Sequence, residues 1–287
     1  MAQQPVAYLY TEFLESDEAR PIRILSEYLE PLRRFKQQKI QDTVVFFGSA
    51  RVDSRERAER ALKTLRARGE GVNDAVYLAE LGKSSKAVEW ARYYEDAREL
   101  AHLLTAWSAT LPSENHRFVV TSGGGPGIME AANRGASEAG GKTIGLNIRL
   151  PFEQDANPYI TDGLHFEFHY FFMRKFWFAY LAKALVIFPG GFGTCDELFE
   201  ILTLVQTDKL SKKIDVILYG REYWDQVLAF QPMADWGAIA DKDLELLNYC
   251  DTPADAFEHL RQHLITHHLE TQSAQEAAAP GIAKTRG

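Results

Sequence analysis

The chain has 287 residues, of which 46% are hydrophobic and 12% aromatic, and its formal net charge is -8. This length and apolar content suit one large α/β domain or two small ones, and they exclude a disordered chain. The negative charge argues against a nucleic-acid-binding surface, which usually needs a basic patch, so we expect no nucleic-acid partner.

The compartment is indicated by the cysteines and by the hydropathy pattern. Cys195 and Cys250 form no metal-like pair, and so few cysteines are typical of a reducing cytosol. No apolar run approaches the roughly 20 residues of a membrane span, and residues 1–20 carry acids where a signal peptide has a basic region. We therefore expect a cytoplasmic protein with no membrane partner.

The first element expected is an N-terminal helical arm over residues 1–40. The pair Arg20-Pro21 is typical of a helix start, and apolar residues follow it at helical spacing. These residues are Ile22, Leu25, Tyr28 and Leu29.

The first strand is predicted at residues 43–47, a continuous apolar run that suits a parallel strand covered on both faces. It runs into Gly48 and Ser49 and then into a charged helix over residues 54–68. This order is typical of the first strand-to-helix turn of a nucleotide-binding fold, although an ordinary loop would show it too. Crossover helices are expected to fill the long segment up to residue 112.

A second strand, residues 117–121, runs into a glycine-rich turn over residues 123–127. Consecutive glycines let a backbone approach a ligand closely, whereas the need for a positive φ explains only one of them. Further strands are expected at residues 143–148 and 165–169, and between them a polar loop follows the first.

An aromatic helix is predicted from Tyr170, and its continuous apolar residues predict that it is largely buried. It contains the adjacent cations Arg174 and Lys175. Two cations in such a helix need an anion or a water-filled cleft, unless they extend to water at the edge of the helix.

The second glycine turn, residues 190–193, follows an apolar strand at residues 184–188. Its backbone N–H groups are expected to cradle a phosphate, helped by the positive end of the helix dipole. Thr194 is predicted to be the N-cap of the next helix, with Asp196 and Glu197 in its first turn. Beside a phosphate at this helix start, Glu197 is expected to stay ionised.

The remaining chain is expected to add strands at residues 215–220 and 246–250 and a last helix over residues 253–268. The recurring strand–turn–helix order predicts a Rossmann-like α/β fold, a doubly wound parallel sheet with helices on both faces. We expect three parts: the arm (1–40), a single domain (41–268) and a disordered tail (269–287).

Two histidine patterns are weaker signals. His259, His263 and His267 recur every four residues, a spacing that can bind metal, but no carboxylate partner is evident. We expect a solvated helix face there and no metal site. His165, Glu167 and His169 are explained by a half-exposed strand.

In a doubly wound sheet the glycine turns lie together at the carboxyl edge, where ligands bind. Together with Arg174-Lys175 they suit a phosphorylated ligand. Neither turn is a P-loop or a G-x-G-x-x-G motif, so a dinucleotide cofactor is not expected. Glu197 is either an acid that pairs with the helix dipole or a carboxylate that stabilises a cationic sugar, as in glycoside cleavage.

These motifs resemble those of the LOG ("Lonely Guy") family. Residues 189–197 are similar to its PGGxGTxxE signature, residues 122–129 to its GGGxxGLM motif, and Arg174-Lys175 to its Arg-Lys pair. The resemblance covers roughly residues 43–251. Glu130 in place of a glycine, the long segment between the first two strands and the extra arm and tail are similar to the longer bacterial subgroup.

The resemblance implies hydrolysis of the N-glycosidic bond of nucleoside 5′-monophosphates, such as AMP or cytokinin ribotides, to free base and ribose 5-phosphate without a cofactor. It also implies a homodimer or higher homo-oligomer with the site near the interface. Arg174 and Glu197 become the catalytic pair. The implied substrate-binding residues are Gly48, Ser49, Gly124, Gly125, Gly127, Met173, Lys175, Gly190, Gly191, Gly193, Thr194, Asp196 and Thr203.

Two alternatives remain open. A nucleotide-binding sensor could use the same pocket without hydrolysis, although phosphate binding alone does not need Glu197. Family members are also often labelled lysine decarboxylases. That reaction with pyridoxal phosphate needs a Schiff-base lysine and an acid for the pyridine nitrogen, and neither Lys175 nor Lys183 has a recognisable partner of this kind.

Overall fold

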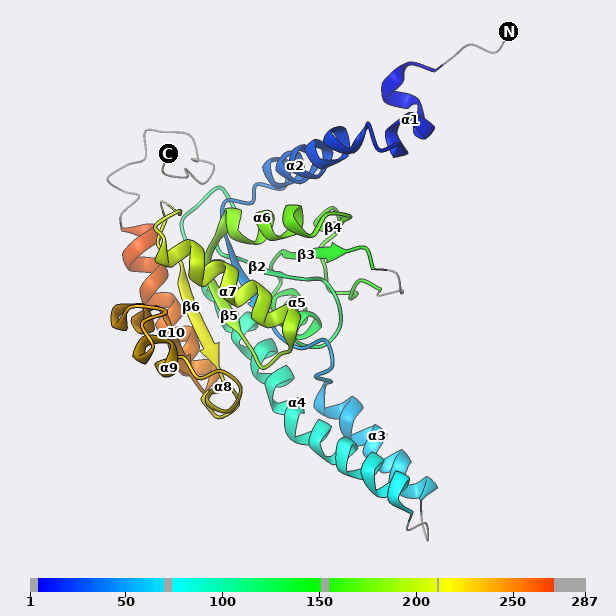
Figure 1. Ribbon diagram of the computed structural model, residues 1–287, viewed down its shortest axis with the longest axis vertical. Coiled ribbons are helices and arrows are strands. Elements are labelled where there is room, and N and C mark those ends of the chain that lie inside the picture. The colour runs from blue at the N-terminus through cyan, green and yellow to red at the C-terminus, as the bar shows by residue number, and fades with distance from the viewer. Residues whose placement is uncertain (1–4, 70–73, 151–154, 211, 271–287) are drawn as a thin grey trace.

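The structure is a computed structural model that describes residues 5–69, 74–150, 155–210 and 212–270. Seven parallel strands form one sheet in the order β4-β3-β2-β1-β5-β6-β7, with helices on both faces (Figure 1). The strands are β1 (Thr43–Phe47), β2 (Val119–Ser122), β3 (Thr143–Ile148), β4 (His165–Phe168), β5 (Ala182–Ile187), β6 (Asp215–Tyr219) and β7 (Asn248–Cys250). The predicted doubly wound parallel sheet is confirmed.

The helices follow the expected alternation with the strands. Those before β1 are η1 (Ala7–Leu9), α1 (Thr11–Glu15) and α2 (Arg20–Gln37). Those from β1 to β5 are α3 (Arg55–Arg68), α4 (Ala75–Ser108), α5 (Ile128–Glu138) and α6 (Phe171–Leu181). The rest are α7 (Phe192–Gln206), α8 (Arg221–Val227), α9 (Gln231–Asp235), η2 (Asp241–Leu246), α10 (Pro253–Leu264) and the π-helical turn η3 (Ile265–Leu269).

The sheet changes its direction of growth between β1 and β5. From β1 the chain adds β2, β3 and β4 on one side, and it then returns to place β5, β6 and β7 on the other. β1 and β5 are therefore neighbours whose following loops lead to opposite sides of the sheet. The crevice at the carboxyl ends of such a pair is the usual ligand site of open α/β sheets.

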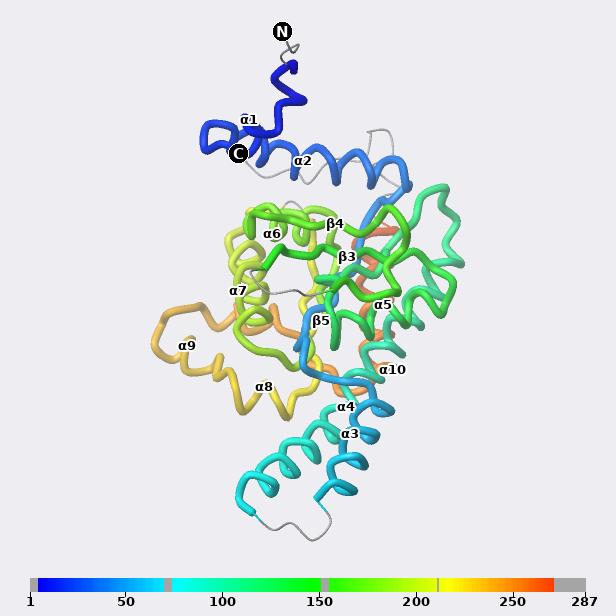
Figure 2. Tube along the Cα trace, turned by 90° about the vertical axis from the view of Figure 1, so that its right-hand side faces the viewer, coloured from blue at the N-terminus to red at the C-terminus, as the bar shows by residue number. Residues whose placement is uncertain are grey.

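The core has two layers, one on each face of the sheet. Every residue of β1 is buried, and consecutive residues contact opposite layers. Phe46 stacks against Phe188 at 6.2 Å, whereas Phe47 packs edge-on against Phe178 of α6 at 4.7 Å. Helices α2, α6 and α7 contribute to the layer that holds Phe47, and α4, α5 and α10 to the other (Figures 1 and 2).

The crossover between β1 and β2 is a helical hairpin that extends past the sheet. Helix α4 has 34 residues, so it is roughly 50 Å long. Its buried residues begin at Ala91, and its first half lies beside α3 beyond the carboxyl edge of the sheet (Figures 1 and 2). Ser54 and Asp74 cap the two helices by accepting hydrogen bonds from backbone N–H groups.

Some expectations were wrong in detail. Helix α6 is covered on one side only, because Phe171, Phe172 and Phe176 are 50%, 54% and 37% exposed. The second strand begins at Val119, since Phe118 has a φ of 51°, which interrupts an extended chain. Residues 271–287 of the expected tail and residues 151–154 of the polar loop lie outside the described residues. None of the described helices could cross a membrane.

Candidate functional site

A cavity of about 300 Å³ lies at the carboxyl ends of β1, β2, β3 and β5. The turn after β1 and the two predicted glycine turns contribute to it, together with the starts of α6 and α7. Its lining consists of Phe47, Gly48, Ala50, Gly123, Met129, Asn147, Ile148, Leu150, Phe171, Arg174, Phe178, Gly191, Gly193, Thr194 and Glu197. The fold thus brings together segments that are up to 150 residues apart in the sequence.

The backbone of Ser49 ties the three turns to one another. Its N–H donates to the carbonyl of Pro189 at 2.9 Å, and its carbonyl accepts from the N–H of Ile128 at 3.1 Å. Gly127 has a φ of 72°, and a Cβ there would lie 2.3 Å from the carbonyl oxygen of Ser49. The close contact between these loops therefore requires a glycine at this position.

The turn after β5 carries the start of α7. The N-cap is Gly191 and not Thr194, so the predicted cap was wrong. Thr194 is the third residue of the helix and packs over Gly190, where a Cβ would lie 2.1 Å from its Oγ1. The first N–H groups of α7, those of Phe192 and Gly193, have no carbonyl partner within the helix, which suits them to bind a phosphate.

Arg174 and Glu197 form a buried ion pair in the cavity. Arg174 Nη2 lies 3.4 Å from Glu197 Oε1, and the two side chains are 15% and 5% exposed. Burial raises the pKa of Glu197 to about 7, although Arg174 and Lys175 act in the opposite direction. Burial also lowers the pKa of the Arg174 guanidinium.

These positions correct two expectations about Glu197. Because α7 begins at Phe192, Asp196 and Glu197 lie in its second turn and not in its first. A carboxylate with a pKa of about 7 is only partly ionised at neutral pH, so the expectation that Glu197 simply stays ionised was also wrong.

The two adjacent cations of α6 point to different places. Arg174 lies in the cavity, with its guanidinium 5.2 Å and 5.6 Å from the ring centroids of Phe171 and Phe178. Lys175 Nζ lies 2.8 Å from both Asp196 Oδ2 and Glu200 Oε2. Lys175 and Asp196 therefore form an ion pair beside the cavity. Neither is among the described residues that line the cavity.

Other predicted binding residues support the cavity or lie away from it. The carbonyls of Gly124 and Gly125 each accept a hydrogen bond from Asn157 Nδ2 at 3.1 Å, which fixes the glycine turn after β2. Met173 is 7% exposed and packs in the core. Thr203 is exposed, and its hydroxyl donates to the carbonyl of Phe199 in its own helix.

Several lining residues were not predicted from the sequence, among them Asn147, Met129, Phe171 and Phe178. Asn147 is the most informative because its side chain is polar and only 7% exposed. The available signal was a single amide within the otherwise apolar end of a predicted buried strand.

Comparison with known proteins shows which family the second half of the chain resembles. Residues 129–260 match the family profile described as "Possible lysine decarboxylase", a label that LOG proteins often carry. Over these residues the chain is similar to that family. No curated protein matches its sequence.

Solved structures similar to this chain include that of TM1055, which is 22% identical with a TM-score of 0.45. The match covers 77% of this chain and 99% of TM1055. Two structures of the molybdenum cofactor carrier protein from Chlamydomonas reinhardtii are 21% and 23% identical, with TM-scores of 0.39. These two matches cover 60% and 61% of this chain, and 88% and 89% of the carrier protein.

The decarboxylase label of the LOG profile implies pyridoxal phosphate, which the cavity does not fit. That cofactor needs a lysine for its Schiff base. No lysine is among the described residues that line the cavity. Lys175 is held by two carboxylates, and Lys183 lies near the amino end of β5, at the opposite edge of the sheet.

The histidines near the C-terminal end of the described chain are less solvated than predicted. His259 Nε2 lies 3.0 Å from Asp215 Oδ2, and this contact raises the pKa of the imidazole. His268 is buried, with Nε2 2.8 Å from the carbonyl of Lys213. The prediction of a solvated histidine face without a carboxylate partner was therefore wrong, because α10 packs against β6. In the described part of the chain, no group of side chains is arranged to hold a metal ion.

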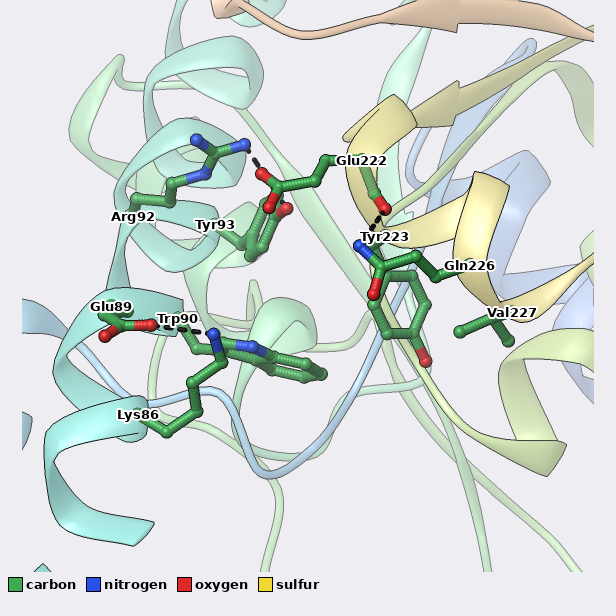
Figure 3. Close-up of a pocket in the computed structure, with 9 residues that line it drawn as sticks. All are labelled: Lys86, Glu89, Trp90, Arg92, Tyr93, Glu222, Tyr223, Gln226 and Val227. Carbon is green, nitrogen blue, oxygen red and sulfur yellow. Dashed lines mark hydrogen bonds and ion pairs between the residues drawn. The ribbon is translucent and has the colours of Figure 1, made fainter. Parts of the chain in front are cut away.

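A second cavity, of about 420 Å³, lies between α4 and α8. Glu222 of α8 points toward Arg92 of α4 across it, and Trp90 packs edge-on against Tyr223 at 5.5 Å (Figure 3). The hydroxyl of Tyr223 donates to the carbonyl of Gly190 at 2.8 Å. Tyr223 therefore forms a wall of this cavity and also supports the glycine turn of the first one.

Proposed function

We propose that this protein hydrolyses the N-glycosidic bond of nucleoside 5′-monophosphates, AMP or a cytokinin ribotide, and releases free base and ribose 5-phosphate. The observation that carries the proposal is the Arg174–Glu197 pair in one cavity with the start of α7. A phosphate site alone would not need a buried carboxylate beside it. The free thiols of Cys195 and Cys250 support a reducing, cytoplasmic setting.

In the proposed mechanism the phosphate binds the N–H groups at the start of α7, where the helix dipole favours an anion. Arg174 adds a positive charge from α6. The ionised carboxylate of Glu197 contacts the ribose and stabilises the oxocarbenium-like transition state as the bond from C1′ to the base breaks. Water attacks C1′ and gives up a proton, and the departing base takes up a proton.

The experiment is incubation of the purified protein with a panel of nucleoside monophosphates, with free base measured by chromatography. We expect adenine and ribose 5-phosphate from AMP, and a loss of at least about 100-fold in kcat for Glu197→Gln. Glu200→Gln is the matched control, because Glu200 lies one turn further along α7 and does not line the cavity. Near-wild-type turnover by Glu197→Gln would contradict the proposed role.

A non-catalytic nucleotide sensor is the alternative that uses the same cavity. It predicts that AMP binds in calorimetry and is recovered intact after prolonged incubation with the wild-type protein. Release of adenine that depends on Glu197 excludes this alternative.

A further inference from the structure

The second cavity, between α4 and α8, has no part in the proposed reaction. Its volume of about 420 Å³ is within the range of small-molecule sites. Three aromatic side chains line it, Trp90 and Tyr93 from α4 and Tyr223 from α8. The indole of Trp90 is nearly perpendicular to both tyrosine rings, with centroid distances of 6.3 Å to Tyr93 and 5.5 Å to Tyr223. Each edge-to-face pair uses only one ring face, so other faces remain on which a planar ligand can stack.

The charges of this lining balance one another. The described residues that line the cavity include two cations, Lys86 and Arg92, and two acids, Glu89 and Glu222. Lys86 Nζ lies 2.7 Å from Glu89 Oε2, and Glu222 points toward Arg92 (Figure 3). Because no net charge is left over, the cavity favours a ligand that is itself uncharged.

Two uncharged polar groups in the lining are open to a ligand. In the described part of the chain the indole N–H of Trp90 has no acceptor, and its nitrogen keeps accessible surface. The carboxamide of Gln226, an exposed residue, points from α8 toward α4 (Figure 3). Its Nε2 donates to the carbonyl of Glu222 at 2.9 Å, whereas its Oε1 has no partner among the described residues. A ligand that pairs with both groups needs an acceptor and a donor.

We propose that the cavity between α4 and α8 binds a free nucleobase. A nucleobase is planar, uncharged at neutral pH, and carries both ring-nitrogen acceptors and N–H donors, so it suits the rings, the charge balance and the polar groups. A nucleotide suits the cavity less well, because the balanced lining does not neutralise a phosphate. The inference rests on the proposed function in one respect, since a free base is a product of that reaction.

Tyr223 connects this cavity to the proposed phosphate site. Its hydroxyl donates to the carbonyl of Gly190 at 2.8 Å, and Gly190 directly precedes Gly191, the N-cap of α7. Its ring packs edge-on against Trp90 and against Trp224, at 5.5 Å and 5.1 Å. A base stacked in the cavity holds the Tyr223 ring in place and thereby preorganises the start of α7 for a phosphate. Base and phosphate should therefore each increase the affinity for the other.

Calorimetry with adenine as the probe tests the site. The wild-type protein is expected to bind adenine, and Trp90→Leu is expected to weaken this binding about tenfold or more, because the stacking surface is lost. Trp236→Leu is the matched control, because Trp236 is 89% exposed and lies outside the described lining. Adenine that binds only in the cavity of Glu197 would bind Trp90→Leu and wild type equally. That result, or no binding to wild type, would overturn the inference.

Circular dichroism checks that each variant folds. Should Trp90→Leu fail to fold, Gln226→Leu decides, because its side chain is exposed and the substitution removes the acceptor. It is expected to weaken adenine binding about fivefold or more. Gln231→Leu, at an exposed glutamine of α9, is its control. Equal adenine affinities of these two variants would overturn the inference.

The coupling is tested by the affinity for ribose 5-phosphate with and without adenine. In wild type, adenine is expected to increase this affinity about fivefold, and the increase should be absent in Trp90→Leu and in Tyr223→Phe. An increase that persists in both variants would contradict the path through Tyr223. Adenine binding that depends on Trp90, without release of base from AMP, would support the site and contradict the proposed hydrolysis. Release of base without such binding would contradict the site alone.

Discussion

At the scale of single residues, the buried position of Glu197 predicts a pH dependence of activity. The proposed reaction needs its ionised form, and burial raises its pKa to about 7. Below this value kcat/KM for AMP should rise about tenfold per pH unit, and above it the profile should level off. The residual rate of Glu197→Gln serves as the control, since it contains only the titration of the substrate. A wild-type profile that is flat from pH 5 to pH 8 would contradict the assignment.

The same burial predicts that Glu197 destabilises the fold at high pH. Its folded-state pKa is raised, so its contribution to stability is present below its ordinary pKa and is lost as the pH rises through about 7. Glu197→Gln should therefore raise the free energy of unfolding by about 1–3 kcal/mol at pH 8 and change it little at pH 4. Urea denaturation at both pH values measures this. Equal or lower stability of the variant at pH 8 would contradict it, and Glu200→Gln is the control.

Single residues also show which parts of the site could be predicted from the sequence. Arg174 and the acids after the glycine turn at residues 190–193 could be recognised because the residues of the site lie within short contiguous motifs. The ion pair between Lys175 and Asp196 could not be predicted from the sequence, because it depends on how α6 packs on α7. The position of Asn147 in the cavity wall could not be predicted for a similar reason, since it depends on how the loop after β2 packs against β3.

At the scale of elements, helix α2 holds the helix that carries Arg174. The N-cap of α6, Tyr170, makes no side-chain cap, and the Glu27 carboxylate of α2 accepts from the N–H groups of His169 and Tyr170 at 2.7 Å and 3.2 Å. Glu27→Ala should cost about 1 kcal/mol of stability and lower kcat/KM up to about tenfold, because Arg174 loses its fixed position. Thermal unfolding and the AMP assay measure these effects.

The matched control for Glu27→Ala is Glu30→Ala on the same helix, whose carboxylate pairs with Arg34. If the two variants behave alike in both measurements, α2 does not position α6.

The strands were predicted closely because continuous apolar runs between turn residues specify buried parallel strands. Element ends were predicted less well. The prediction that Thr194 caps α7 was wrong because Gly191 is the N-cap, three residues earlier. The prediction of a solvated face on α10 was wrong because His259 pairs with Asp215, a residue distant in the sequence. Such contacts depend on tertiary packing, which local sequence patterns do not contain.

At the scale of the whole molecule, exposed apolar residues gather on the N-terminal helices and on α6. Helices α1 and α2 lie at the end of the molecule opposite the tip of the α3–α4 hairpin (Figure 1). Most of the large apolar side chains that are exposed in the described residues belong to this end. They are Val6, Tyr8, Leu9, Tyr10, Ile22, Leu25, Leu29, Phe171, Phe172 and Phe176. Apolar surface of this kind is typical of an interface between subunits.

We therefore predict that the protein forms a homodimer or larger homo-oligomer through α2 and α6, which pack together through Tyr28 and Phe176 at 5.6 Å. Leu25→Glu places a charge on this surface and should shift the assembly toward the monomer, as light scattering coupled to size-exclusion chromatography would show. Leu78→Glu is the matched control, because Leu78 is 51% exposed against 54% for Leu25 and lies on the distant half of α4. A wild-type monomer, or equal effects of both substitutions, would show that this surface does not join subunits.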